Sequence, residues 1–175
     1  MNLIEDKNFL KIEHIKFIEN TILKSNFPFY YQNYSVPEDN NEILTHVVIK
    51  GPEYRKQDEP FSDSNYLNIF IDILNTFCKK NNILVNKIYR IGVNLTFNNG
   101  VKKCQTHIDH DFPHKQLLIY LNDIKDKNSY TVLINKKKIK KIKPVKYKGI
   151  CFDNVPHYHY YPKKGARIVA VFTFK

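Results

Sequence analysis

Several residue types are scarce in this chain of 175 residues, and each shortage narrows the class of protein. There is no tryptophan, there are only 5 glycines, and the 3 cysteines include no C-x-x-C pair. An odd number of cysteines without that spacing argues against a disulfide framework and against a cysteine zinc site. Sparse glycine without any low-complexity tract indicates a globular chain and not a disordered one.

Long apolar runs are also missing, and the first residues lack the basic and then apolar pattern of a signal peptide. We therefore expect no membrane-spanning segment and no membrane partner, and a cytoplasmic location. The length fits a single domain covering residues 1–175.

Acidic residues are outnumbered, with 28 Lys and Arg against 17 Asp and Glu, for a net charge of +11. This excess favours acidic partners, so nucleic acid is one candidate partner. The densest basic segment, Lys136–Lys143, fits either a strand with a solvated face or a phosphate-binding edge. Arginine is rare, because only Arg55, Arg90 and Arg167 are arginine and every other basic residue is lysine.

Hydrophobic periodicity divides the chain at about residue 82. The first part predicts a helix at 6–24, loops at 26–41 and 51–64, a strand at 43–50, and a second helix from Ser62 or Asp63 to 81–82. The second part predicts short strands near 83–97, 102–109, 115–122, 129–134, 138–143, 148–153, 156–161 and 166–174. We therefore expect a mainly β fold with supporting helices, in which a helical support of about 1–82 braces a jelly-roll core of about 83–175.

A candidate metal site begins at His107 and Asp109. If 102–109 is a strand, these side chains point to the same face and offer an imidazole and a carboxylate side by side. A later histidine, His157 or alternatively His159, would complete two histidines and one carboxylate, the facial triad of non-haem iron enzymes. Such a triad leaves one face of the metal open for substrate and oxygen, unlike a structural zinc site.

Arg167 lies in the apolar segment 165–172, where a guanidinium is costly unless an anion pairs with it. Arginine can grip a carboxylate at two points, as a dicarboxylate cosubstrate requires. The alternative is an arginine that pairs with an acidic residue of the chain itself.

From about Lys87 to the C-terminus the chain resembles the 2-oxoglutarate and Fe(II)-dependent oxygenases, especially the branch that is similar to prolyl 4-hydroxylases. The resemblance rests on an ordered set of short pieces. These are His107-Ile108-Asp109, Leu118-Ile119-Tyr120-Leu121-Asn122, Pro144, Gly149, Phe152, His157 and Gly165-Ala166-Arg167.

The resemblance implies a double-stranded β-helix, a jelly roll that is open at one end. It implies that His107, Asp109 and His157 bind Fe(II), and that Arg167 and Tyr120 bind the far carboxylate of 2-oxoglutarate. The implied reaction uses O2, with ascorbate as a candidate reductant, and releases succinate and CO2. The spacing to Arg167 in the family favours His157 over His159.

The implied function is a dioxygenase that hydroxylates a protein or peptide side chain, with proline as one candidate. Three alternatives remain open from the sequence. They are a nucleic-acid oxidative demethylase, a non-enzymatic jelly-roll binding protein, and a cupin-like zinc or manganese enzyme.

Overall fold

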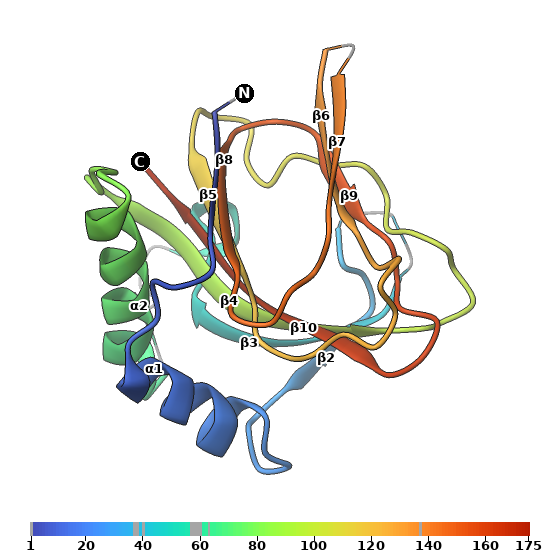
Figure 1. Cartoon of the computed structure of the whole chain (residues 1–175), viewed down its shortest axis with the longest axis horizontal. Helices are drawn as coiled ribbons and strands as arrows, with labels where there is room; N and C mark the ends of the chain where they lie inside the picture. The colour runs from blue at the N-terminus through green and yellow to red at the C-terminus, as the bar shows by residue number, and fades with distance from the viewer. Residues whose placement is uncertain (1, 37–38, 40, 57–60, 63, 137) are drawn as a thin grey trace.

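The computed structural model describes residues 2–36, 39, 41–56, 61–62, 64–136 and 138–175. Helices are confined to the first half of the chain, and strands dominate the second half (Figure 1). The elements are β1 (Leu3–Asp6), α1 (Ile12–Phe17), the π-helix η1 (Ile18–Ile22), β2 (Tyr30–Gln32), β3 (Ile43–Ile49), the 3₁₀ helix η2 (Pro52–Tyr54), α2 (Leu67–Lys80), β4 (Ile88–Phe97), β5 (Lys115–Tyr120), β6 (Thr131–Asn135), β7 (Lys138–Ile142), β8 (Gly149–Asp153), β9 (His157–His159) and β10 (Ala166–Phe174).

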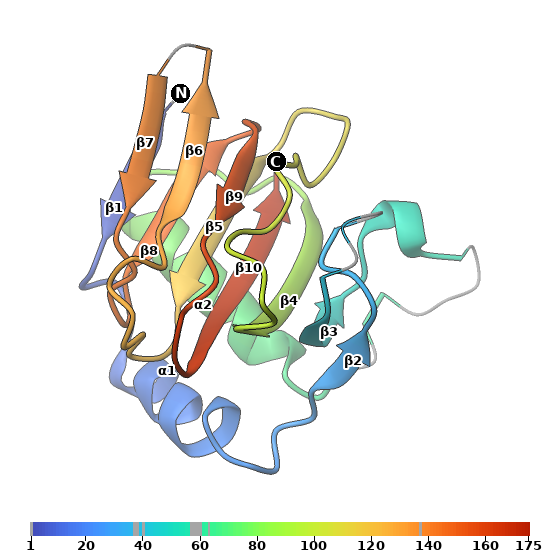
Figure 2. The ribbon, with the colours of Figure 1, turned by 90° about the vertical axis from the view of Figure 1, so that its right-hand side faces the viewer.

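The strands form two antiparallel sheets that face each other. The larger sheet has the order β1-β8-β5-β10-β4-β3-β2, and the smaller sheet has the order β7-β6-β9. Both α-helices lie on one side of the larger sheet, and the smaller sheet lies on its other side (Figures 1 and 2). This arrangement confirms the predicted mainly β jelly roll with supporting helices.

The N-terminal part differs from the prediction in detail. The helix predicted at 6–24 begins only at Ile12, because Leu3–Asp6 pairs with β8 as the edge strand β1. Three strands of the larger sheet, β1 to β3, therefore precede residue 82. The second helix begins at Leu67 and ends at Lys80, close to the predicted end, while Asp63 lies outside the described residues.

Strict alternation along the central strands produces two cores. Leu117 and Ile119 of β5 pack toward the helices, whereas Leu118 and Tyr120 pack between the sheets. Strand β10 alternates in the same way, which places Val169 and Val171 on the inner face. Because residues two apart share a face of a strand, Arg167 also points between the sheets.

The basic segment Lys136–Lys143 forms the edge of the smaller sheet, with Lys137 outside the described residues. Every residue of β7 except Ile142 is exposed, and the Lys140 Nζ atom lies 3.4 Å from a carboxylate oxygen of Glu5. The strand with a solvated face, one of the two predicted alternatives, accounts for this placement.

In the part of the chain that the structure describes, no helix combines the length and the apolar composition that crossing a bilayer requires.

Gly149 of β8 lies directly against the aromatic side chains that cover the larger sheet. A Cβ atom at this position would lie 2.7 Å from Cε2 of Phe77 and 2.9 Å from Cε1 of Phe9, two buried rings in edge-to-face contact. We expect Gly149→Ala to lower the free energy of unfolding by about 1–3 kcal/mol, the usual cost of overpacking a core. Urea unfolding followed by circular dichroism measures this change.

Gly92→Ala is the matched control, because its Cβ would meet its nearest neighbour at 3.5 Å, an ordinary contact. Equal destabilisation of the two variants would contradict the steric account.

Candidate metal and cosubstrate site

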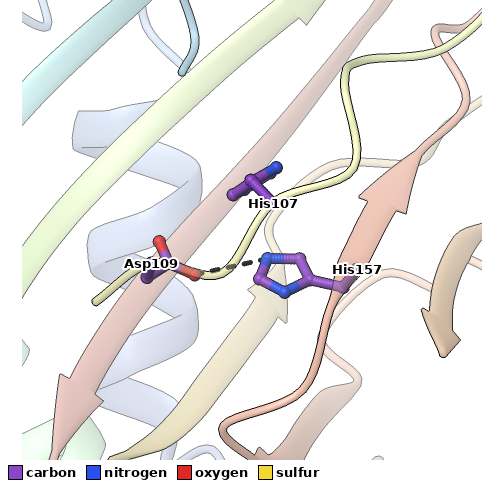
Figure 3. Close-up of side chains that lie close together, drawn as sticks. All are labelled: His107, Asp109 and His157. Carbon is purple, nitrogen blue, oxygen red and sulfur yellow. Dashed lines mark ion pairs between the residues drawn. The ribbon is translucent and has the colours of Figure 1, made fainter. Parts of the chain in front are cut away.

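His107, Asp109 and His157 converge on one point between the sheets (Figure 3). One ligand atom from each residue lies within 4.8 Å of the other two. The group consists of two imidazoles and one carboxylate, as the sequence predicted, and this donor set suits a non-haem iron site.

The predicted strand at 102–109 is wrong, because this segment pairs with its neighbour at only two isolated bridges, Lys103–Tyr160 and His107–His157. The His107 N–H donates to the His157 carbonyl at 3.0 Å, and the His157 N–H donates back at 2.9 Å. The backbone bridge thus brings the two histidines together directly. The place of Asp109 follows from the irregular backbone after the bridge and not from strand alternation.

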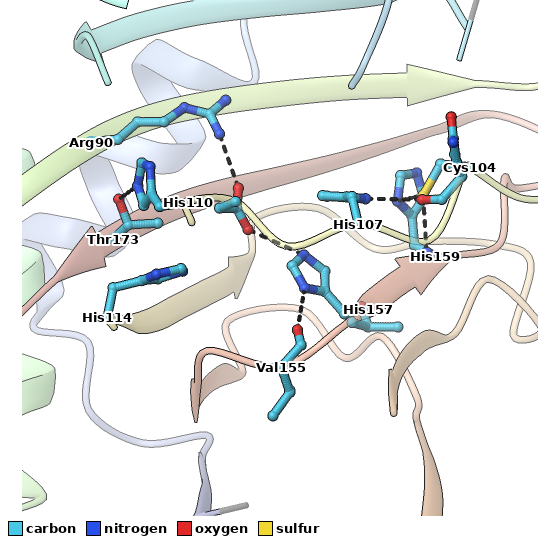
Figure 4. A network of polar contacts seen from close by, with 12 residues as sticks. Arg90, Cys104, His107, His110, His114, Val155, His157, His159 and Thr173 are labelled. Carbon is cyan, nitrogen blue, oxygen red and sulfur yellow. Dashed lines mark hydrogen bonds and ion pairs between the residues drawn. The ribbon is translucent and has the colours of Figure 1, made fainter. Parts of the chain in front are cut away.

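Backbone carbonyls fix the orientation of both imidazoles (Figure 4). Nδ1 of His107 lies 2.9 Å from the carbonyl oxygen of Gln105, and Nδ1 of His157 lies 3.1 Å from that of Val155. Donation from Nδ1 leaves the lone pair on Nε2, the arrangement that orients histidine ligands in metal sites. Burial, followed by the nearby His157, lowers the pKa of His107 and favours the neutral imidazole that a metal needs.

Asp109 is held from both sides, and its side chain is only 7% exposed. Arg90 Nη1 donates to Oδ1 at 3.2 Å, while Oδ2 lies 3.3 Å from Nε2 of His157 and has no hydrogen-bond partner among the described residues. Burial raises the pKa of Asp109, but the adjacent His157 and the charge of Arg90 outweigh burial and lower it strongly.

The residues present fit a divalent metal ion. A buried carboxylate oxygen without a hydrogen-bond partner and two imidazole lone pairs together provide three ligand atoms on one side of a common point.

Arg90 acts on the site through Asp109, because its ion pair sets which carboxylate oxygen remains available. We expect Arg90→Gln to weaken Mn(II) binding by ~10- to 100-fold, the usual cost of losing a partner of a metal ligand. Isothermal titration calorimetry of the metal-free protein measures this change. Asn94→Ala is the control, since Asn94 accepts its hydrogen bond from Thr45 and holds no metal ligand in place. Unchanged Mn(II) affinity in Arg90→Gln would refute the proposed effect of Arg90 on Asp109.

The triad opens into a cavity of about 600 Å³ between the sheets. Arg167 lines this cavity, is 2% exposed, and has no carboxylate partner among the described residues. Its Nη2 donates to Oγ1 of Thr131 at 3.1 Å, and its Nε has no partner. The predicted alternative of an internal acidic partner therefore has no support in this part of the chain.

Two other sequence candidates lie beside Arg167. The Tyr120 ring centroid is 5.6 Å from the guanidinium carbon, but its hydroxyl donates to Thr131 at 2.7 Å and the residue does not line the cavity. His159 lines the cavity without joining the cluster of ligand atoms. The geometry therefore favours His157 as the third ligand.

Sequence reasoning missed Thr131, which connects Tyr120 to Arg167, because nothing near it in the sequence distinguishes it from other strand threonines. His110 and His114, which follow Asp109 in the chain, are buried. His110 contacts Glu53 and, at 2.7 Å, Oγ1 of Thr173, so both of its ring nitrogens are occupied by structural partners.

No protein-family model and no curated protein matches the sequence. Solved structures are nevertheless similar in fold. An oxidoreductase of the 2OG-Fe(II) oxygenase family from Burkholderia pseudomallei superposes with a TM-score of 0.77 at 12% identity, over 99% of this chain and 84% of that chain.

Two prolyl hydroxylases are also similar. The enzyme from Trichoplax adhaerens, solved with a peptide fragment of hypoxia inducible factor, has a TM-score of 0.62 at 20% identity, over 98% of this chain and 83% of that chain. The viral collagen prolyl hydroxylase from Paramecium Bursaria Chlorella virus-1, solved with 2OG, has a TM-score of 0.60 at 15% identity, over 99% of this chain and 94% of that chain. The fold of this chain is that of the 2-oxoglutarate and Fe(II)-dependent oxygenases, which confirms the expected double-stranded β-helix.

Proposed function

We propose that the protein is a 2-oxoglutarate- and Fe(II)-dependent dioxygenase that hydroxylates a protein or peptide side chain, with proline as the first candidate residue. One observation carries the proposal. A triad of His107, Asp109 and His157 opens into the same cavity as Arg167, a buried guanidinium that lacks an anionic partner among the described residues. A metal ion would bind the three ligand atoms of the triad, and a dicarboxylate bound in the cavity would supply the anion that Arg167 lacks.

In this proposal His107, Asp109 and His157 hold Fe(II), and Arg167 holds the far carboxylate of 2-oxoglutarate. Iron supplies the binding and reduction of O2, coupled to conversion of 2-oxoglutarate to succinate and CO2. One oxygen atom of O2 enters succinate and the other enters a C–H bond of the substrate. A fold relative from Streptomyces hygroscopicus, solved with nickel and 2-oxoglutarate, supports this pair of ligands.

The edge of the larger sheet supports a peptide substrate. Among the described residues, strand β2 is the last strand of that sheet, and its outer backbone groups pair with no other described strand, so an extended chain could pair there (Figure 2). Tyr30 and Tyr31 are 64% and 59% exposed on this strand, and Tyr31 and Gln32 line the cavity. A peptide added to β2 would therefore run along the mouth of the cavity, as a substrate side chain requires.

The test supplies the metal-loaded protein with 2-oxoglutarate, O2, ascorbate and a library of proline-containing peptides. We expect succinate to form together with a peptide that gains the mass of one oxygen atom, as detected by mass spectrometry. Chelation of the metal should abolish both products. Failure of the Mn(II) form to bind 2-oxoglutarate would refute the proposal and leave a jelly-roll binding protein.

Methylated single-stranded oligonucleotides form a second substrate panel, because the net charge of +11 also suits a polyanion. Demethylation of these oligonucleotides, with binding that weakens steeply as salt increases, would assign the nucleic-acid alternative in place of the peptide.

A further inference from the structure

Three polar side chains from three strands line the same cavity as the triad. His159 of β9 lies directly opposite Thr131 of β6 in the antiparallel pairing, so the two side chains share the inner face of the smaller sheet. Arg167 of β10 reaches Thr131 from the larger sheet through its 3.1 Å hydrogen bond. All three residues line the cavity. On the inner face of β9, His157 therefore belongs to the triad, and His159 lies beside Thr131, the hydrogen-bond partner of Arg167.

A buried thiol sets the position of the proton on His159 (Figure 4). Sγ of Cys104 accepts the backbone N–H of His159 at 3.2 Å and also lies 3.2 Å from Nδ1 of the same residue. Because Sγ already accepts the backbone N–H of His159, we assign the thiol as the donor to Nδ1. The ring proton of the neutral imidazole is then on Nε2.

Free donors therefore gather beside Arg167. Nε2 of His159 and Nε of Arg167 are both buried without a hydrogen-bond partner among the described residues. Oγ1 of Thr131 already accepts from Tyr120 and from Arg167, so its own proton is available to donate. Buried donors without acceptors are costly, and these belong to residues that line one cavity.

We propose that His159 binds the far carboxylate of 2-oxoglutarate, donating from Nε2 together with Nε of Arg167 and the hydroxyl of Thr131. This assignment rests on the proposed function. A carboxylate accepts hydrogen bonds at about four positions, so three donors can bind it at once. The neutral imidazole donates a directional hydrogen bond and does not place a second positive charge beside the guanidinium. Cys104 is a positioning residue, because it acts only by holding the imidazole in the donating tautomer.

The experiment measures binding of 2-oxoglutarate to the Mn(II)-loaded full chain without O2, using isothermal titration calorimetry. We expect His159→Leu, which keeps much of the volume and loses the donor, to weaken binding ~10-fold or more. His159→Gln keeps an Nε donor and should recover most of this loss. Cys104→Ala should give a smaller loss, because the tautomer is then no longer fixed.

A ligand that lacks the far carboxylate separates direct binding from a change in cavity shape. 2-Oxobutyrate should bind the wild-type chain and His159→Leu with equal, weak affinity, because the contact that His159 makes is missing from both complexes. The affinity for Mn(II) itself should be unchanged in His159→Leu, since His159 is outside the ligand cluster.

Three results would overturn the assignment of His159. These are wild-type affinity of His159→Leu for 2-oxoglutarate, an equal loss for 2-oxobutyrate, and a loss of Mn(II) binding. If the wild-type chain binds Mn(II) but no 2-oxoglutarate, the proposed function itself fails, and this outcome is distinct from the other three. If His159→Leu does not fold, Cys104→Ala keeps the test valid, because wild-type affinity of that variant for 2-oxoglutarate would contradict the role of the Cys104–His159 contact.

Discussion

Asp109→Ala is expected to bind Mn(II) or Fe(II) more than ~100-fold more weakly than the wild-type chain and to form no succinate from 2-oxoglutarate. Loss of a group that only supports a ligand already costs ~10- to 100-fold in affinity, so loss of the ligand itself costs more. The variant removes the single carboxylate of the triad, so only the two imidazoles of His107 and His157 remain as protein ligands. Calorimetry with Mn(II) and a succinate assay measure the two effects.

Asp111→Ala is the matched control for this variant. It removes a carboxylate two positions further along the same segment, on an exposed residue outside the ligand cluster. We expect it to keep the metal affinity of the wild-type chain. Circular dichroism should show that both variants are folded. If Asp109→Ala bound Mn(II) as tightly as Asp111→Ala, the triad would not be the metal site.

Arg167→Met is expected to weaken 2-oxoglutarate binding ~100-fold or more while leaving Mn(II) binding intact. The guanidinium is the only cation in the described part of the cavity whose charge is buried without an anion, so its loss removes the main attraction for the far carboxylate. A truncation that leaves a buried charged group unpaired costs several kcal/mol, and here the unpaired group would be the cosubstrate carboxylate.

Although Arg167→Met should weaken 2-oxoglutarate binding, it should not lower the stability of the free protein. Burial lowers the pKa of Arg167, which reflects the cost of placing the guanidinium between the sheets. Replacing an uncompensated buried charge by an apolar side chain is often neutral or stabilising, so the free protein should gain between 0 and about 2 kcal/mol. 2-Oxoglutarate at about 100 times its wild-type Kd should then stabilise the wild-type chain by about 2.7 kcal/mol and Arg167→Met by about 0.4 kcal/mol or less.

Arg167→Lys is the control for charge alone. Lysine keeps the positive charge but lacks the planar fork, so we expect an affinity between those of the wild-type chain and Arg167→Met. A marked loss of stability in cosubstrate-free Arg167→Met would instead show that Arg167 is a structural residue. In that case the thermal unfolding curves with and without 2-oxoglutarate would shift together.

Much of the fold was predictable because it depends on local alternation. Strand β10 matches its predicted range, and the alternation of Ile168, Val169 and Ala170 is sufficient to place Arg167 on the inner face. Helix α2 was predictable from its apolar face and ended where expected. The strand predicted at 102–109 failed, because whether a segment pairs along its length depends on a partner that lies far away in the sequence.

By itself the sequence determined the chemical types at the site and the face on which Arg167 lies, because both follow from residue identity and strand periodicity. His157 and His159 share a face of β9, and only the tertiary structure shows that His157, and not His159, lies beside His107 and Asp109. The register of two bridges accounts for this placement, since pairing with His107 brings His157 to Asp109 while Cys104 contacts the ring of His159. Such a register is set by packing across the whole sheet, which no short stretch of sequence encodes.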